Sequence, residues 1–136
     1  MDNMSILVRY CRTYTERKLK EYDLSFGEQI ILMFLSNNEN VNQDTIAKTY
    51  MIDKSMVAKT LDKLEKKGYV LRKQNPENKR ENIISLEQKG YDILCHMRVI
   101  HKEWKELLYE GISEEEIKFL NNLTGRMVEN VTKYLD

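Results

Sequence analysis

Residues 42–70 of this chain read NQDTIAKTYMIDKSMVAKTLDKLEKKGYV, and this segment has the pattern of two helices joined by a tight turn. Asn42 and Asp53 are short polar residues whose side chains can accept the free N–H groups of a helix's first turn. Apolar residues then recur at the i, i+4, i+7 spacing of a helix, namely Val57, Leu61 and Leu64. We therefore predict a short helix over residues 42–50 and, after a tight turn, a longer helix over residues 53–67.

The segment after this helix has the pattern of a β-hairpin. Gly68 stands where a helix C-cap is expected. Residues 69–74 and 81–86 are short runs rich in Val, Leu and Ile, and the sequence Asn-Pro-Glu-Asn at 75–78 suits a type I turn between them. Two helices joined by a tight turn and followed by a two-stranded hairpin form a winged helix-turn-helix unit.

Capping boxes mark further helix starts. In a capping box, a Ser side chain bonds to the backbone of a Glu or Gln three residues on, whose side chain bonds back. The chain has three such pairs: Ser25 with Glu28, Ser85 with Gln88, and Ser113 with Glu116. With apolar residues at helical spacing before Ser25, they predict helices over residues 4–22, 25–37, 85–109 and 114–135. The predicted fold class is mainly α with a small β-hairpin.

The composition suits one ordered domain over residues 1–136, with charge distributed unevenly along the chain. The net charge is zero, but residues 41–81 hold ten Lys and Arg against six Asp and Glu, a balance of +4. The other residues hold twelve against sixteen, a balance of −4. A basic middle with acidic ends is what a DNA-binding unit joined to an assembly scaffold would show, and a chance asymmetry of a solvated surface is the alternative.

The chain offers little for other classes of function. No apolar run approaches the roughly 20 residues that span a bilayer, and the N-terminus lacks the pattern of a signal peptide, so we expect a cytoplasmic protein that does not enter a membrane. Cys11 and Cys95 are interpreted as reduced thiols that act as small buried hydrophobes. His96 and His101 are five residues apart, which argues against a metal pair, and no phosphate loop or nucleophile motif is present. We expect no enzyme, no metal and no cofactor.

The outward face of the helix over 53–67 has the residue types of a DNA-recognition helix. Ser55, Met56 and Lys59 near its start could reach base edges, while Lys54, Lys63 and Lys66 could hold phosphates. The hairpin adds Lys73, Lys79 and Arg80 at or beside its tip, where an Arg could enter a narrow minor groove. An ordinary amphipathic helix with a solvated lysine face is the alternative.

Residues 42–48, 52–70, 78–80 and 86–90 together resemble the MarR family of bacterial regulators, and the resemblance covers about residues 25–95. It implies that Ser55, Met56, Ala58 and Lys59 face the major groove and that Arg80 enters the minor groove. The expected DNA-binding set comprises Asn42, Gln43, Lys54, Ser55, Met56, Ala58, Lys59, Lys63, Lys73, Lys79 and Arg80.

The sequence departs from this family in two places. The family's wing pattern Asp-x-Arg reads Asn78-Lys79-Arg80 here, and its Leu-Thr helix start reads Leu86-Glu87. Loss of the Asp removes a charge that would orient Arg80, so we expect a more mobile wing. We expect Ser85 and Gln88 to replace the missing Thr cap.

The flanking helices have the apolar surfaces of a dimer interface. The last helix has one apolar side, formed by Ile117, Leu120, Met127, Val131 and Leu135. The long helix before it is apolar on more than one side and needs two partners, which a second copy supplies better than a monomer. We therefore expect residues of about 25–90 to form a DNA-binding winged helix, and residues of about 1–24 and 91–136 to form dimerisation helices.

The family resemblance also implies a signal. Related proteins release DNA when a small ligand enters the cleft beside the winged helix or when a cysteine is oxidised, and Tyr10, Tyr14 and Trp104 could line such a cleft. Aromatic residues at helical spacing are also common in a plain core, and the sequence assigns no effector.

The sequence thus predicts a homodimeric regulator of transcription that binds an inverted-repeat operator in duplex DNA, as a repressor relieved by a small ligand or a stress signal. Activation is open, and a winged helix that binds protein instead of DNA is the alternative function.

Overall fold

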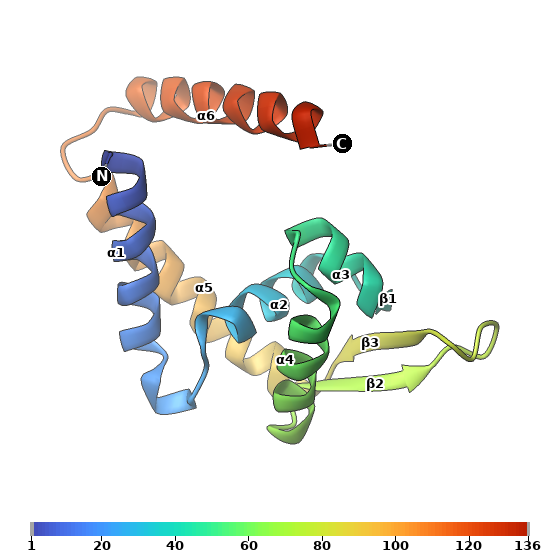
Figure 1. Ribbon diagram of the computed structural model, residues 1–136. Coiled ribbons are helices and arrows are strands. Elements are labelled where there is room, and N and C mark those ends of the chain that lie inside the picture. Colours follow the sequence, from blue (N-terminus) through green and yellow to red (C-terminus); the bar gives the residue numbers. More distant parts are fainter. Residues whose placement is uncertain (1, 136) are drawn as a thin grey trace. The chain divides into compact units, whose positions relative to one another are not determined.

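The computed structural model describes residues 2–135 and is mainly helical with one small sheet (Figure 1). Its elements in chain order are α1 (Asn3–Lys18), the 3₁₀ helix η1 (Lys20–Tyr22), α2 (Phe26–Asn37), β1 (Val41–Asn42), α3 (Gln43–Tyr50), α4 (Lys54–Lys66), β2 (Val70–Gln74), β3 (Asn82–Leu86), α5 (Gln88–Leu108) and α6 (Glu114–Leu135). The predicted fold class is confirmed. The residues up to His101 form one compact unit and those from Lys102 onward form a second.

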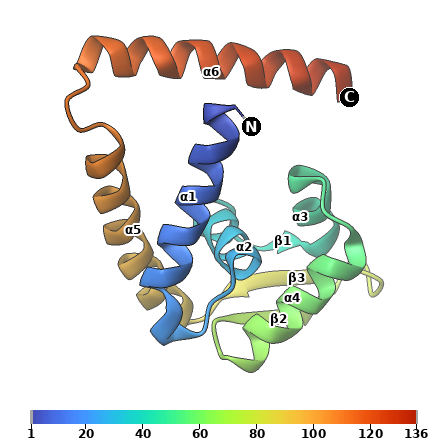
Figure 2. The same ribbon diagram turned by 60° about the vertical axis from the view of Figure 1, so that its left-hand side comes forward.

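The first unit contains the helix-turn-helix and a three-stranded antiparallel sheet of order β1-β3-β2. The hairpin of β2 and β3 is the predicted wing, with Arg72 opposite Ile84 in its register. The two-residue strand β1, which lies opposite Ile83 and Ile84, was missed because so short a strand shows no alternation of apolar residues. Figure 2 shows the unit from a second direction, with α4 next to β2.

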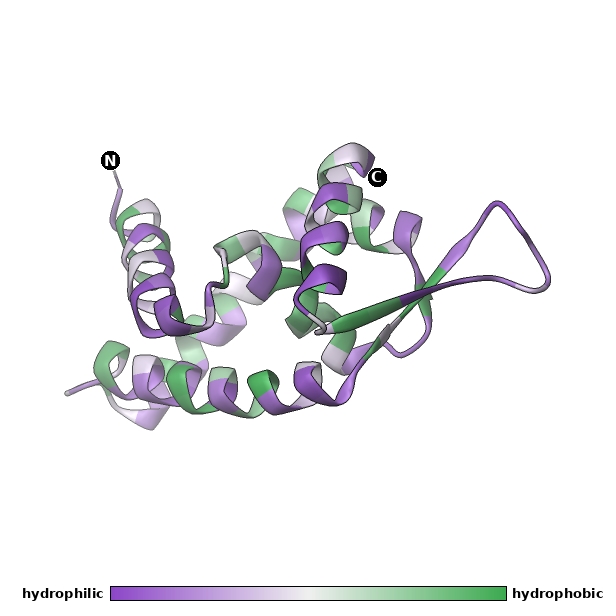
Figure 3. Cartoon of the chain, turned by 90° about the horizontal axis from the view of Figure 1, so that it is seen from below, coloured by the Kyte–Doolittle hydropathy of each residue, from purple (hydrophilic) through white to green (hydrophobic). Residues whose placement is uncertain are grey.

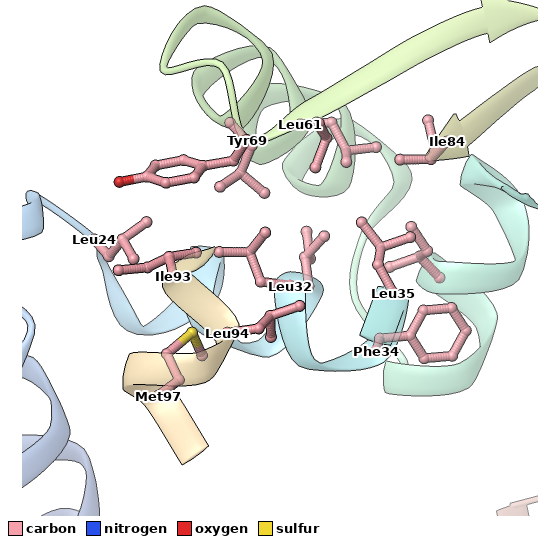
Figure 4. Packing of buried hydrophobic residues seen from close by; sticks show 14 of the residues in the cluster. Leu24, Leu32, Phe34, Leu35, Leu61, Tyr69, Ile84, Ile93, Leu94 and Met97 are labelled. Carbon is pink, nitrogen blue, oxygen red and sulfur yellow. The ribbon is translucent and has the colours of Figure 1, made fainter. Parts of the chain in front are cut away.

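The core of the first unit lies between α2, α4, the sheet and the first turns of α5 (Figure 4). Leu32 and Leu35 of α2, Leu61 of α4 and Ile84 of β3 are almost fully buried in it. Each such side chain contributes roughly 1.5–3 kcal/mol of hydrophobic free energy. This core fixes the orientation of α4 against the wing.

The predicted capping box that begins α2 is confirmed. The Glu28 N–H donates to Ser25 Oγ (3.3 Å), and the Ser25 N–H donates to Glu28 Oε1 (3.5 Å). The Glu28 side chain is buried although it is ionisable. Its Oε2 accepts a hydrogen bond from Nζ of Lys67, just after the end of α4, at 2.8 Å, and this contact compensates for the burial. The N-terminus of α2 and the C-terminus of α4 are therefore joined by a charged contact.

The capping box predicted at Ser85 is wrong. Ser85 lies in β3 opposite Leu71 of β2, so its backbone belongs to the sheet and is not free to cap a helix. The strand continues to Leu86, and α5 begins at Gln88. Ser85 and Gln88 are three positions apart, as in a capping box, but the pairing of β2 with β3 decides the local structure.

Tyr69 holds the junction between the sheet and α5. Its carbonyl oxygen accepts the N–H of Glu87 at 3.0 Å, and a Cβ atom placed on Gly90 would lie 2.4 Å from the same oxygen. Only glycine therefore permits α5 to approach the start of β2 this closely.

The second unit contains α6. The predicted capping box is confirmed: the Glu116 N–H donates to Ser113 Oγ (3.2 Å) and the Ser113 N–H donates to Glu116 Oε2 (2.9 Å). Gly111 before it has a φ of 76°, which suits glycine in the predicted break between the helices. Among the described residues of α6, no side chain is buried.

Candidate nucleic-acid interface

The turn between α3 and α4 is short and well bonded. The Ile52 N–H donates to the carbonyl of Ala47 at 3.0 Å, which closes the end of α3. Met51 adopts a left-handed conformation with a φ of 53°, although it is not a glycine. The tight turn predicted between residues 50 and 53 is confirmed, and it consists of Met51 and Ile52 with Asp53 before α4.

The two faces of α4 differ as the helical periodicity predicts. Val57, Leu61 and Leu64 are fully buried. On the exposed side lie Ser55, Met56, Lys59, Lys63 and Lys66, with Ala58 half-buried beside them. Met56 keeps 56% of its surface exposed, so a large apolar side chain stands in solvent near the start of the helix.

The start of α4 is bonded differently from the prediction. The Asp53 side chain caps no N–H group of α4 and accepts instead the hydroxyl of Ser55. Lys54 reaches back to Asp44 of α3 at 3.5 Å, but both side chains are largely exposed, so this ion pair contributes little stability.

Asn42 caps α3 as predicted, and its amide also contacts the wing. Its Oδ1 accepts the N–H of Thr45 at 2.8 Å, and its Nδ2 donates to Glu81 Oε1 at 2.6 Å. Gln43 is the first residue of α3 and is half-buried. The Asn42 amide is thus engaged within the protein.

Most basic side chains on α4 and the wing are unpaired. Within residues 2–135, no acidic group forms a salt bridge with Lys59, Lys63, Lys66, Lys73, Lys79 or Arg80, and all six are exposed. The connection between β2 and β3 that carries two of them is hydrophilic and projects away from the helices (Figure 3).

Arg72 is the contrasting case. Its guanidinium bonds to Asp62 and to Glu65 Oε1 (3.3 Å), and its N–H donates to Glu65 Oε2 (3.0 Å). Burial of this guanidinium disfavours its charged form, but the hydrogen bonds to the two carboxylates outweigh that effect and raise the pKa of Arg72. Arg72 therefore joins β2 to α4 and is the ion-pair partner of both Asp62 and Glu65.

The wing tip has its own hydrogen bonds. Asn78 Oδ1 accepts the N–H of Arg80 at 3.1 Å, Asn75 Oδ1 accepts the N–H of Glu77 at 3.0 Å, and Gln74 Nε2 donates to the carbonyl of Lys79 at 2.7 Å. The amide oxygen of Asn78 thus makes the backbone contact that a carboxylate at this position could make. Greater mobility of the wing stays a prediction.

Glu81 is the residue that the sequence reasoning missed. Its carboxylate accepts from the side-chain amides of both Asn42 and Asn75, the latter at 2.9 Å. Asn42 and Glu81 are 39 residues apart, and no local pattern could have paired them.

The residues proposed for a ligand site are divided between the two units. Tyr10 is 63% exposed on α1, and Tyr14 is half-buried with Lys18 Nζ 5.5 Å from the centre of its ring. Trp104 belongs to the second unit and is half-buried.

The cysteines differ from the prediction in part. Cys11 is half-buried, and this burial raises the pKa of its thiol. Cys95 is exposed, so its interpretation as a buried hydrophobe is wrong. The first turns of α5 bury Ile93, Leu94 and Met97 in the core, and Cys95 faces away from them.

Two properties of residues 2–135 bear on other classes of function. Across residues 2–135, no three His, Cys, Asp or Glu side chains are gathered where they could bind one metal ion. No helix in this part of the chain has the length and apolar character needed to cross a bilayer.

Comparisons with known proteins agree with this geometry. A model of the MarR family matches residues 26–82. The HTH-type transcriptional regulator SarZ of Staphylococcus aureus strain USA300 is 34% identical over 114 residues, which cover 82% of this chain and 75% of SarZ. A MarR transcriptional regulator from Methanosarcina mazei Go1 has a similar structure, with a TM-score of 0.91, 29% identity, and coverage of 96% of this chain and 94% of that one.

A structure with DNA shows the same fold. The MarR family regulator from Listeria monocytogenes that was crystallised with a 26mer DNA has a TM-score of 0.89 at 22% identity, over 96% of this chain and 87% of that one. Because these relatives are transcriptional regulators, the expectation that the chain is not an enzyme is confirmed. By its family match, its similarity to SarZ and its winged helix, this chain belongs to the MarR family of transcriptional regulators.

Proposed function

We propose that this regulator binds an inverted repeat in duplex DNA sequence-specifically, with α4 in the major groove and the wing in the minor groove. The observation that supports this most strongly is the set of exposed basic side chains without acidic partners within residues 2–135, which lie on both α4 and the wing. A winged helix that binds protein has no need of free positive charge on both elements. The Listeria protein of the same fold was crystallised with DNA, which supports the same proposal.

The proposed roles follow from position and chemistry. Ser55, Met56, Ala58 and Lys59 stand at the exposed start of α4 and meet base edges, where Lys donates to guanine and Met contacts a thymine methyl. Phosphates are held by Gln43, Lys54, Lys63, Lys73 and Lys79. Arg80 at the wing enters the minor groove, and Asn42 acts by positioning α3.

We propose further that the active form is a homodimer. None of the described side chains of α6 is buried, and Leu120, Met127 and Val131 on its apolar side are exposed. Exposed apolar side chains also occur along α1, where Leu7 and Val8 are examples. A second copy that covers such faces would carry a second winged helix, and the two would read half-sites about ten base pairs apart.

The regulator is proposed to act in the cytoplasm as a repressor whose operator binding is relieved by a small molecule or a stress signal. Tyr10, Tyr14 and Trp104 are the aromatic residues proposed to contact such a molecule.

The test is selection of bound duplexes from a random library by the purified protein at two salt concentrations. Enrichment of an inverted repeat, with affinity that falls steeply as salt rises, supports the proposal because phosphate contacts release counterions. Absence of enrichment together with negligible binding at low salt contradicts it, and would favour the protein-binding alternative.

A further inference from the structure

Glu81 connects the wing to the helix-turn-helix, because one oxygen of its carboxylate contacts the start of α3 and the other contacts the wing. It follows Arg80 directly and stands where the wing tip returns to β3. Oε1 accepts from Asn42 Nδ2 at 2.6 Å, and Oε2 accepts from Asn75 Nδ2 at 2.9 Å. Its backbone is held as well, since its carbonyl accepts the Asn75 N–H at 2.8 Å and its N–H donates to the Asn78 carbonyl at 3.0 Å.

The bond to Asn42 reaches the first turn of α3. The same Asn42 side chain that donates to Glu81 accepts from the backbone N–H of Thr45 at 2.8 Å and from its hydroxyl at 2.7 Å. One chain of hydrogen bonds therefore runs from the start of α3, through Asn42 and Glu81, to Asn75 at the base of the wing tip. Arg80 and Asn78 lie within the loop that these bonds close.

We propose that Glu81 is a positioning residue that fixes Arg80 relative to α3, so that the wing and the helix-turn-helix read one DNA site in a fixed register. This inference rests on the proposed DNA binding. A carboxylate beside a phosphate-binding surface repels DNA, so its effect as a charge and its effect as an anchor have opposite signs. That opposition makes the inference testable.

The experiment compares Glu81→Ala with Glu77→Ala on the operator obtained by selection and on a random duplex. Both substitutions remove one negative charge from the same wing. The Glu77 side chain, however, forms no hydrogen bond or salt bridge with residues 2–135, so only Glu81→Ala also removes the two amide contacts. We expect Glu77→Ala to leave sequence preference unchanged and to bind both duplexes slightly more tightly.

For Glu81→Ala we expect the preference for the operator over a duplex altered at the base pairs under the wing to fall by about tenfold, without loss on random DNA. Glu81→Gln keeps the shape of the side chain but only one of its two acceptor oxygens. Its preference for the operator should therefore lie between those of wild type and Glu81→Ala. In the Arg80→Ala background, Glu81→Ala should have little further effect on preference, because Glu81 acts through Arg80.

Side-chain amide signals in NMR spectra test the anchor without DNA. We expect Glu81→Ala to shift the amide protons of Asn42 and Asn75, and Glu77→Ala to leave those of Asn42 in place. The inference is overturned if wild type binds the operator and Glu81→Ala has the same sequence preference as Glu77→Ala. It is also overturned if the effects of Glu81→Ala and Arg80→Ala on preference are additive. Failure of wild type to bind any duplex would overturn the proposed function itself, which is a distinct result.

Discussion

The winged helix and α6 differ in how their apolar side chains are covered. In the winged helix, Leu61, Leu64 and Ile84 are fully buried within one chain. In α6, Phe119 and Val128 are exposed, and Tyr134 keeps 89% of its surface in solvent. The winged helix therefore buries its apolar core within one chain, whereas α6 has the apolar surface of an element that needs a partner.

The charges of the two regions differ in the same sense. Within residues 2–135, Lys59, Lys63 and Lys79 are among the winged-helix lysines without an acidic partner. In contrast, α6 begins with Glu114, Glu115 and Glu116. An acidic helix start is stabilised by the helix dipole and has no use in contacting phosphates. We infer that binding of DNA and assembly of the protein are carried by separate surfaces, and the following substitutions challenge that division.

The largest expected effect is on the core of the winged helix. Leu61→Ala should lower the free energy of unfolding by about 2–5 kcal/mol, because the side chain is fully buried and leaves a cavity. Met33→Ala, at an exposed position of α2, should change it by no more than about 0.5 kcal/mol. Urea denaturation followed by circular dichroism measures both, and equal effects would show that the first unit does not form the core described above.

The next effect concerns assembly. Val131→Asp places a charge on the exposed apolar side of α6 and should weaken the dimer by about a hundredfold, since an unpaired charge at an interface is poorly tolerated. Asn130→Asp adds the same charge to a polar position of the same helix. Sedimentation velocity should show dissociation for Val131→Asp alone. A wild-type protein that stays monomeric at all concentrations would show that α6 is not an assembly surface.

A smaller effect is expected where α2 meets the end of α4. Lys67→Met leaves the Glu28 carboxylate, whose side chain is 3% exposed, without the ammonium group 2.8 Å away. Because Lys67 is itself 25% exposed, we expect a loss of about 1–3 kcal/mol, less than for a fully buried pair. Lys66→Met, at an exposed position without a salt bridge to residues 2–135, is the control in the same denaturation experiment. Equal stabilities would mean that this ion pair does not hold the two helices together.

Two DNA-binding variants separate positioning contacts from specific ones. Lys63→Ala should weaken binding to all duplexes alike and reduce the slope of log affinity against log salt by about one, because one phosphate contact is lost. Arg80→Ala should reduce preference for the operator more than affinity for random DNA. Fluorescence anisotropy at several salt concentrations measures both quantities, and an equal loss on random DNA from both variants would contradict the assigned roles.

The smallest effect is chemical. Burial raises the pKa of the Cys11 thiol, so less of it is thiolate at neutral pH, whereas Cys95 is exposed. Iodoacetamide should therefore label Cys95 before Cys11 at pH 7, and the rates should converge as the pH rises toward the raised pKa of Cys11. Mass spectrometry of the peptides resolves the two sites. Faster labelling of Cys11 at pH 7 would show that this thiol is activated.

Local patterns were sufficient to predict the exposed face of α4 and most helix bounds, but not the end of α1 at Lys18 or the start of α5 at Gln88. Capping boxes at Ser25 and Ser113 mark the starts of α2 and α6, because a capping box involves residues only three apart. Helical periodicity likewise predicts correctly that Leu64 is buried and that Lys63 is exposed. Such features depend on neighbours along the chain.

Features that depend on distant partners were missed. Ser85 has the spacing of a cap but lies in β3, because Leu71 pairs with it across the hairpin. The strand β1 exists only through its pairing with β3, and the contact of Asn42 with Glu81 requires that pairing too. Whether a polar side chain at the interface is free or engaged is therefore decided by tertiary structure.

If one surface binds DNA while another assembles the protein, the mass of the complex with the selected operator should show both. Native mass spectrometry at low salt should find two chains per duplex for wild type, and for Val131→Asp a single chain that binds more weakly. A single wild-type chain on the full operator, or no complex at any salt concentration, would show that the protein does not bind DNA through an assembled dimer.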